Sequence, residues 1–296
     1  MDDERSDVLS TYRHLRLAMP LLLGMLLVAV ALRALSAPNG VCFEGSISAY
    51  YFTSVRAVFV AALAALGACL IIYRGNTPGE DIALNVSGAL AFVVAFVPTH
   101  TPRAMGVACS ATNVPNMHEL DEAVTNNVWA LIIVTFAAIV LAMYLLGRSS
   151  KEGDERRALW VQLWAFLAVL ALGTAAFVVW PDGFRDNAHL VAAFGTFIGI
   201  VIVVALNAFH LGGVSGPAPD GLEPRQTFAR TMYVLIVTAM VLTMVVVGVL
   251  YRVVSGWRHG ALWIEALLIV EFLVFWVVQT YELWPTTRRY ARPASA

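Results

Sequence analysis

The chain has 296 residues, of which 59% are hydrophobic and 13% are charged, and its formal net charge is −1. Soluble domains average about 45–50% apolar and about 25% charged residues, and a soluble chain with this much apolar surface could not cover it. Composition therefore excludes a soluble domain. The near-neutral charge, with Lys151 as the single lysine, also excludes the basic surface that nucleic acids require.

The apolar residues form runs that are long enough to cross a bilayer, which takes roughly 20 residues in a helix. These runs do not alternate with period two, as barrel strands do, so each run predicts a helix. We expect an all-α, polytopic transmembrane bundle of eight helices, forming a single membrane domain over residues 1–296. The predicted spans are residues 18–36, 54–73, 82–98, 125–147, 159–180, 189–209, 230–251 and 261–283.

Positive charge predicts the orientation of the bundle, because cytoplasmic segments carry an excess of Lys and Arg. Of the 19 Lys and Arg residues, thirteen fall on the side of the N-terminus, four on the opposite side, and Arg33 and Arg56 inside spans. We therefore expect a multi-pass protein of the cell membrane with both termini in the cytoplasm. One alternative stays open: a small-x-small site at Ala34–Ser36 would allow cleavage of the first span as a signal peptide, which would leave seven helices.

The three cysteines predict one covalent link. Cys42 and Cys109 fall in the first and second loops on the side opposite the termini, where conditions are oxidising. Cys69 lies inside the second span. We expect a disulfide between Cys42 and Cys109, and an ordinary packing role for Cys69.

Ionisable residues inside the spans gather at one depth. Arg33, Arg56 and Glu265 each lie within about a turn of the non-cytoplasmic end of a helix. A charge in lipid costs at least about 2.5–3.5 kcal/mol, so such groups usually face the bundle interior and pair. We expect an ion pair between Glu265 and either Arg33 or Arg56. The alternative is that the two arginines extend to the outer headgroups.

Other polar residues on the same side are candidates for a ligand-binding pocket. The segment Ser46–Thr53, which leads into the second span, carries hydroxyl and aromatic side chains at the outer interface, where aromatic belts are also found. With nearby charged residues and histidines, this segment could line a pocket that opens outward. The candidate ligand-binding residues are Glu44, Ser48, Tyr51, Arg56, His100, His189, Glu265 and Glu271.

Glu271 differs from the others because it lies near the middle of the last span. A carboxyl at this depth is a candidate proton or cation relay, or a buried group that hydrogen-bonds a neighbouring helix. Elsewhere, His118 and Glu122 stand four residues apart, but no third ligand is identifiable. We therefore predict neither a metal nor a cofactor.

The stretch from Ser46 to Thr99 resembles a group of uncharacterised multi-pass bacterial integral membrane proteins. The residues that carry the likeness are Ser46-Ile-Ser-Ala-Tyr-Tyr, Arg56, Phe59, Tyr73-Arg74-Gly75, Glu80-Asp81, Asn85 and Pro98-Thr99. The resemblance implies no activity. The positions to which it points are Ser48, Tyr51, Arg56, Asp81 and Asn85.

Three functions are compatible with these patterns. The first is binding or transport of an amphiphile or small solute through an outer-leaflet polar pocket, with the lipid bilayer and a lipid or small-molecule ligand as partners. The second is a structural or assembly subunit of a membrane complex. The third is a membrane-embedded lipid hydrolase or transferase that uses His100 or His189. Seven-helix hydrolases of the ceramidase and adiponectin-receptor type carry a His four residues after a Ser, but here Phe52 follows Ser48. Enzymatic activity is therefore left open, with no catalytic residue predicted.

Overall fold

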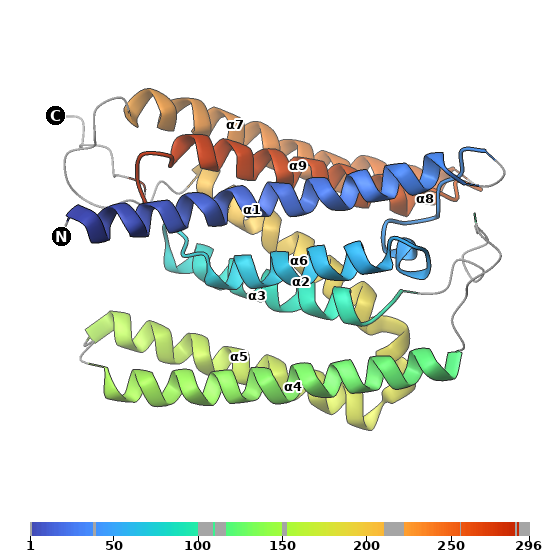
Figure 1. Ribbon diagram of the computed structural model, residues 1–296, viewed down its shortest axis with the longest axis horizontal. Coiled ribbons are helices and arrows are strands. Elements are labelled where there is room, and N and C mark those ends of the chain that lie inside the picture. Colours follow the sequence, from blue (N-terminus) through green and yellow to red (C-terminus); the bar gives the residue numbers. More distant parts are fainter. Residues whose placement is uncertain are drawn as a thin grey trace.

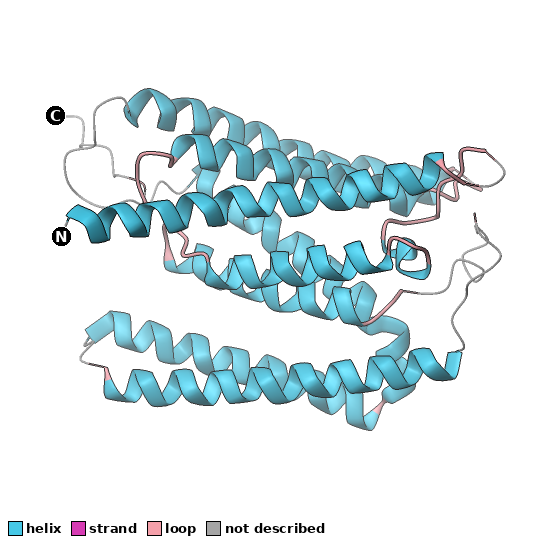
Figure 2. Cartoon of the chain, in the orientation of Figure 1, coloured by secondary structure: helices cyan, strands magenta, loops and turns pink. Residues whose placement is uncertain are grey.

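The structure is a computed structural model that describes residues 2–37, 40–99, 109, 117–149, 153–209, 222–254, 256–287 and 289. Every regular element in these ranges is helical, as predicted, and the connecting segments lie at the helix ends (Figure 2). The elements are α1 (Asp2–Leu35), the 3₁₀ helix η1 (Ser48–Phe52), α2 (Arg56–Ile72), α3 (Pro78–Phe96), α4 (Met117–Arg148), α5 (Gly153–Val179), α6 (Pro181–Phe209), α7 (Leu222–Leu242), the π-helix η2 (Thr243–Val247), α8 (Gly248–Val253) and α9 (Gly260–Glu282).

The described helices match the predicted spans in number and order. Seven are long and apolar enough to cross a membrane, with α7, η2 and α8 forming one continuous rod over Leu222–Val253, and α2 is a shorter apolar helix of 17 residues. Several helices extend well beyond their apolar runs, since α1 begins at Asp2 and α6 at Pro181. Polar residues can continue a helix outside the hydrocarbon, so hydropathy marks the span rather than the helix.

The helices pack as two groups with a peripheral hairpin (Figure 1). In one group α9 packs against α1 and α7, and in the other α3 packs against α2 and α6. The helices α4 and α5 form the hairpin, whose surface is mostly exposed. We call the end where α1 begins and α9 ends the N-terminal end, and the opposite end the distal end (left and right in Figure 1).

The second group is held together by a close backbone approach between α2 and α3. A Cβ atom built on Gly67 would lie 2.7 Å from the Gly88 carbonyl oxygen, and one built on Gly88 would lie 2.6 Å from the Gly67 carbonyl oxygen. Missing side chains allow this approach, as at other small-residue helix contacts in membranes. Residues of this group line one side of the candidate site.

Candidate functional site

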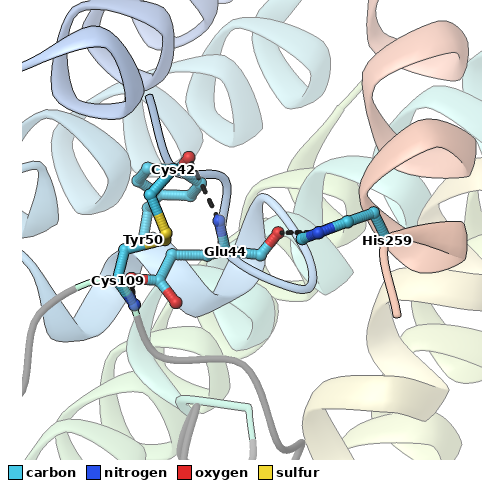
Figure 3. Close-up of a disulfide and its surroundings, with 5 residues drawn as sticks. All are labelled: Cys42, Glu44, Tyr50, Cys109 and His259. Atoms are coloured by element: carbon cyan, nitrogen blue, oxygen red, sulfur yellow. Dashed lines mark hydrogen bonds between the residues drawn. A yellow bond between two sulfur atoms is a disulfide. The ribbon is translucent and has the colours of Figure 1, made fainter. Parts of the chain in front are cut away.

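A disulfide ties together the loops of the distal end. Cys42, in the segment between α1 and η1, is bonded to Cys109, and the two Cα atoms lie 5.6 Å apart (Figure 3). The disulfide predicted from the sequence is thus confirmed. It joins the segment after α1 to the segment after α3, across 67 positions of sequence.

Glu44 lies beside this disulfide and is almost fully buried. Its Oε1 accepts a hydrogen bond from the Cys109 backbone N–H at 3.3 Å (Figure 3). Its backbone N–H donates to the Tyr50 hydroxyl at 3.4 Å, and its carbonyl oxygen lies 3.2 Å from Nδ1 of His259. Burial raises the pKa of Glu44 above its ordinary value of 4.5, and the Cys109 N–H and the nearby positive groups offset only part of this shift. Glu44 therefore connects three segments of the distal end.

The carboxylate of Glu265, on α9, holds the first turn of η1. Its Oε2 accepts a hydrogen bond from the Ser48 backbone N–H at 3.0 Å, and its Oε1 accepts one from the Ser48 hydroxyl at 3.4 Å. The first N–H groups of a helical turn have no partner within the helix, so a carboxylate is well placed there. The carboxylate is thus bonded by the uncharged donors of Ser48, and the expected ion pair of Glu265 with Arg33 or Arg56 stays a prediction.

Arg56 contacts an aromatic side chain. Its Nη2 donates to the Tyr51 hydroxyl at 2.8 Å, and its guanidinium carbon lies 4.3 Å from the centroid of the Tyr51 ring, which is a cation–π arrangement. Tyr51 is buried and Arg56 is half-buried. This contact fixes η1 to the start of α2, while the hydrogen bonds to Glu265 come from uncharged donors.

A cavity of about 60 Å³ lies against η1, where the two helix groups meet. Apolar side chains of α1, α2, α3, α6 and α9 form most of its wall, and Ser48, Thr196 and Glu265 form the polar part. The Thr196 hydroxyl is buried and has no hydrogen-bond partner within the described ranges. One carboxylate and two hydroxyls therefore share an apolar space, which is the usual composition of a small-molecule site.

The volume of this cavity limits what the closed structure can hold. One water molecule takes up about 30 Å³ of the liquid, so the cavity has room for about two waters or for the polar head of a ligand. Most small-molecule pockets measure about 300 Å³ or more. A larger ligand therefore requires the two helix groups to move apart.

The other predicted site residues lie away from this cavity. His189 on α6 is buried, and its Nδ1 lies 2.6 Å from the carbonyl oxygen of Val97, at the end of α3. Glu271 contacts η2, where its Oε1 accepts a hydrogen bond from the Thr243 hydroxyl at 2.7 Å. His100 lies outside the described residues. The distal end thus gathers part of the predicted set, namely Glu44, Ser48, Tyr51, Arg56 and Glu265.

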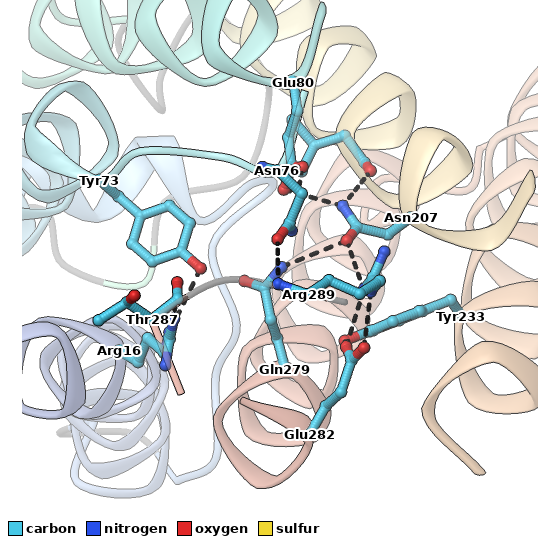
Figure 4. A network of polar contacts seen from close by, with 11 residues as sticks. Arg16, Tyr73, Asn76, Glu80, Asn207, Tyr233, Gln279, Glu282, Thr287 and Arg289 are labelled. Atoms are coloured by element: carbon cyan, nitrogen blue, oxygen red, sulfur yellow. Dashed lines mark hydrogen bonds and ion pairs between the residues drawn. The ribbon is translucent and has the colours of Figure 1, made fainter. Parts of the chain in front are cut away.

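A further network of polar contacts lies at the opposite, N-terminal end (Figure 4), and the residues labelled there are not among the predicted site residues. Arg289, in the segment after α9, forms a bidentate ion pair with Glu282 at 2.6 and 2.7 Å, and both side chains are buried. The hydroxyl of Tyr233, on α7, donates to the same carboxylate at 2.6 Å. Burial lowers the pKa of Arg289, but the hydrogen bonds and charge of Glu282 outweigh burial and raise it, so Arg289 stays charged.

Asn207, on α6, extends this cluster to α3. Its Oδ1 accepts a hydrogen bond from Arg289 at 2.9 Å, and its Nδ2 donates to Glu80 at 2.9 Å (Figure 4). Glu80 also accepts from the Asn76 backbone N–H at 2.8 Å, and Asn76 Oδ1 accepts from the Arg289 backbone N–H at 3.0 Å. Glu80, Glu282 and Arg289 are all buried, and so is Arg16 on α1. Two positive and two negative side chains therefore meet at this end.

Arg16, on α1, holds the segment after α9 in place. Its guanidinium is fully buried and donates to the carbonyl oxygens of Leu283, Thr286 and Thr287 at 2.7, 3.1 and 2.9 Å. The sequence offers one weak signal for this fold-back: Pro285 stands just past the end of α9, where a proline stops a helix. The cluster therefore links α1, α3, α6, α7 and the segment after α9 at the N-terminal end.

A larger hollow, of about 510 Å³, lies between α4 and α5. Its lining is apolar except for Thr174, whose hydroxyl donates to the carbonyl oxygen of Leu170 in its own helix. This open apolar groove has the character of a lipid-facing surface, so the cavity against η1 is the better candidate for a functional site.

Comparison with known proteins finds no family model, no curated protein and no solved structure that matches this chain. The resemblance of residues 46–99 to uncharacterised bacterial membrane proteins stays a prediction.

Proposed function

We propose that this chain binds an amphiphile or small solute in the cavity against η1, through a cationic or hydrogen-bond-donating head. The observation that carries the proposal is the Glu265 carboxylate, which lines an apolar cavity and has Ser48 as its hydrogen-bonding partner. A carboxylate withdrawn from water is best compensated by a cation or by charge-assisted hydrogen bonds. The buried Thr196 hydroxyl supplies a further donor or acceptor for the same head.

In this proposal the distal end faces the extracytoplasmic side of the cell membrane, and both termini lie in the cytoplasm. Two independent features support this orientation. The Cys42–Cys109 disulfide requires an oxidising compartment, and the excess of Lys and Arg falls on the other side of the spans. The cavity then lies in the outer leaflet.

Binding is the core of the proposal, and transport would need a second opening. The Cys42–Cys109 disulfide lies beside Tyr50 of η1 at the distal end (Figure 3), and the buried pair of Arg289 and Glu282 lies at the N-terminal end. Ligand entry therefore requires separation of α1 and α9 from α2, α3 and α6. Passage across the membrane would also require the buried ion pair to open.

Thermal unfolding of the protein in lipid nanodiscs tests the proposal. Primary amines, primary alcohols and alkanes of matched chain length are added as probes. We expect the amine to raise the unfolding temperature most, followed by the alcohol, because both can donate to Glu265. In Glu265→Gln we expect the advantage of the amine over the alkane to disappear.

The matched control is Thr238→Val, because Thr238 is exposed on α7 and, among the described residues, its hydroxyl donates to the Val234 carbonyl of its own helix. This variant should keep the order of stabilisation seen in the unchanged protein. Equal stabilisation by amine and alkane would overturn the proposal, as would an amine advantage that survives in Glu265→Gln.

A second candidate function, a structural or assembly subunit, is favoured by the α4–α5 hairpin. In the most apolar windows of these two helices only 11% and 6% of residues are buried, against 28–44% in the other candidate spans. Native mass spectrometry after extraction in mild detergent separates the two candidates. A subunit would carry a stoichiometric protein partner, whereas a ligand-binding protein would carry bound lipid or small molecules.

A further inference from the structure

A second polar site lies in the middle of α9, on the side that faces α7. Glu271 is separated by eleven residues from each end of α9 (Gly260–Glu282), which places it about 16 Å from both helix ends at 1.5 Å per residue. It is half-buried, and exposed apolar residues flank it along the same helix, including Leu267 and Val270. Glu271 therefore lies at mid-membrane depth beside a surface that lipid can reach.

The partner of Glu271 stands at an irregularity of the neighbouring helix. Thr243 is buried, and its hydroxyl donates to Glu271 Oε1 at 2.7 Å. Thr243 begins the π-helix η2, which interrupts the α-helical rod of α7 and α8. Such turns account for well under 1% of residues and frequently mark functional sites. The irregular turn and the carboxyl thus occur at the same point of one helix interface.

No charged side chain of the described residues compensates Glu271. The titratable groups of the elements around it stand toward the helix ends. They include Arg16 and Arg33 on α1, Arg230 and Tyr233 on α7, Tyr251 and Arg252 on α8, and Glu265, Tyr281 and Glu282 on α9. Of these, Glu282 is bonded to Tyr233 and Arg289, and Glu265 is bonded to Ser48. The second oxygen of Glu271, Oε2, is buried and has no hydrogen-bond partner in the described part of the chain.

We propose that Glu271 and Thr243 form a proton-binding site in the seam between α7 and α9. The carboxyl holds the proton on Oε2, while Oε1 accepts the hydrogen bond from Thr243. The physical reason is that an uncompensated carboxylate at this depth costs at least about 2.5–3.5 kcal/mol, whereas a proton neutralises it without any further protein group. This site is separate from the cavity against η1 and does not depend on the ligand proposed for that cavity.

Modification by dicyclohexylcarbodiimide tests the site, because this apolar reagent reaches carboxyls from the lipid and consumes their acid form. The carboxyl oxygen adds to the central carbon of the carbodiimide, and the acid proton moves to a carbodiimide nitrogen. The O-acylisourea that forms then rearranges to a stable N-acylurea. With the full chain in nanodiscs near pH 7, we expect mass spectrometry to find this adduct on Glu271 of the unchanged protein.

Three variants sharpen the test. Glu271→Gln removes the adduct, and Thr243→Val makes labelling several-fold faster, because the hydroxyl no longer covers Oε1. Glu265→Gln leaves the adduct on Glu271 unchanged, so a failure of the cavity proposal is distinguished from a failure of this one. An unmodified Glu271 in the unchanged protein would overturn the inference. So would protection of Glu271 by Na⁺ at constant pH, since the site would then hold an alkali cation instead of a proton.

Discussion

Arg289 and Glu282 place two opposite charges inside the bundle, where neither would be stable without the other. Removal of one partner leaves a buried charge uncompensated, which costs about 3–5 kcal/mol in such pairs. We expect Arg289→Ala to lower the free energy of unfolding by about that amount, measured by denaturant titration in detergent micelles. Arg225→Ala is the control, because Arg225 is half-buried and its contacts with the described residues are a hydrogen bond to the Tyr281 carbonyl and a cation–π contact with the Tyr281 ring. Equal losses in the two variants would contradict the assignment.

Glu44 makes the stability of the fold depend on pH in the direction opposite to that of most carboxyls. Because burial raises its pKa above 4.5, the folded chain keeps this proton to higher pH than the unfolded chain does. Stability must then fall as the pH rises from 4.5 through the raised pKa, and level off above it. We expect Glu44→Gln to flatten this part of the profile of unfolding temperature against pH. A profile that keeps the same slope in the variant would show that other groups cause it.

The sequence predicts how deep a residue lies in the membrane, but it does not predict which neighbouring element its side chain contacts. The depth of Glu265 follows from its distance to the helix end, yet its partner depends on how η1 folds over α9, and the sequence carries no signal for that. The disulfide was predictable because only two of the three cysteines lie outside the spans. The Arg289 cluster was not predictable. In the sequence, Arg289 is one of several positive residues after the last span, and only the structure shows that this segment folds back onto Glu282.

At the scale of elements, apolar runs predict which segments are helical, and close backbone contacts determine how these helices pack. The π-helix at Thr243–Val247 leaves no trace in hydropathy, since its residues are as apolar as their neighbours apart from Thr243 itself. The starts of α4 and α6 also lie several residues before the apolar runs. Periodicity and hydropathy therefore identify the helices but miss their irregular turns and polar extensions.

The approach of α2 to α3 gives a test at this scale. A Cβ atom at Gly67 would meet the backbone carbonyl of Gly88, which cannot rotate away. We expect Gly67→Ala to destabilise the protein by about 1–3 kcal/mol, as overpacking usually does, in the same denaturant titration. The control is Gly173→Ala on α5, where nothing lies within 4 Å of the Cβ position. There the better helix propensity of alanine should leave stability unchanged or slightly raised, and similar losses at both positions would count against the packing described.

At the scale of the whole molecule, the two ends of the bundle are held together by different interactions. A covalent link and a buried carboxyl secure the distal end, and a balanced group of buried charges secures the N-terminal end. The cavity lies between the two helix groups, close to the covalently closed end. This position of the cavity supports the proposal that the ligand enters from the leaflet at the distal end.

The proposed orientation makes a prediction about the accessibility of the two bonded cysteines. In vesicles whose outer surface is the extracytoplasmic one, a membrane-impermeant reductant followed by an impermeant maleimide should label Cys42 and Cys109. Cys69, inside α2, should stay unlabelled. Inverted vesicles should show labelling only after they are made permeable. Labelling of intact inverted vesicles would place the distal end in the cytoplasm.

Photo-cross-linking with an alkylamine that carries a diazirine is the most direct test of ligand binding next to Glu265. We predict that mass spectrometry will find the cross-links of the unchanged protein on η1 and on the stretch of α9 that lines the cavity, Glu265 to Phe272. In Glu265→Gln these cross-links should be lost, while background labelling of α4 and α5 stays the same. Cross-links confined to α4 and α5 in the unchanged protein would contradict the existence of a binding site in the cavity.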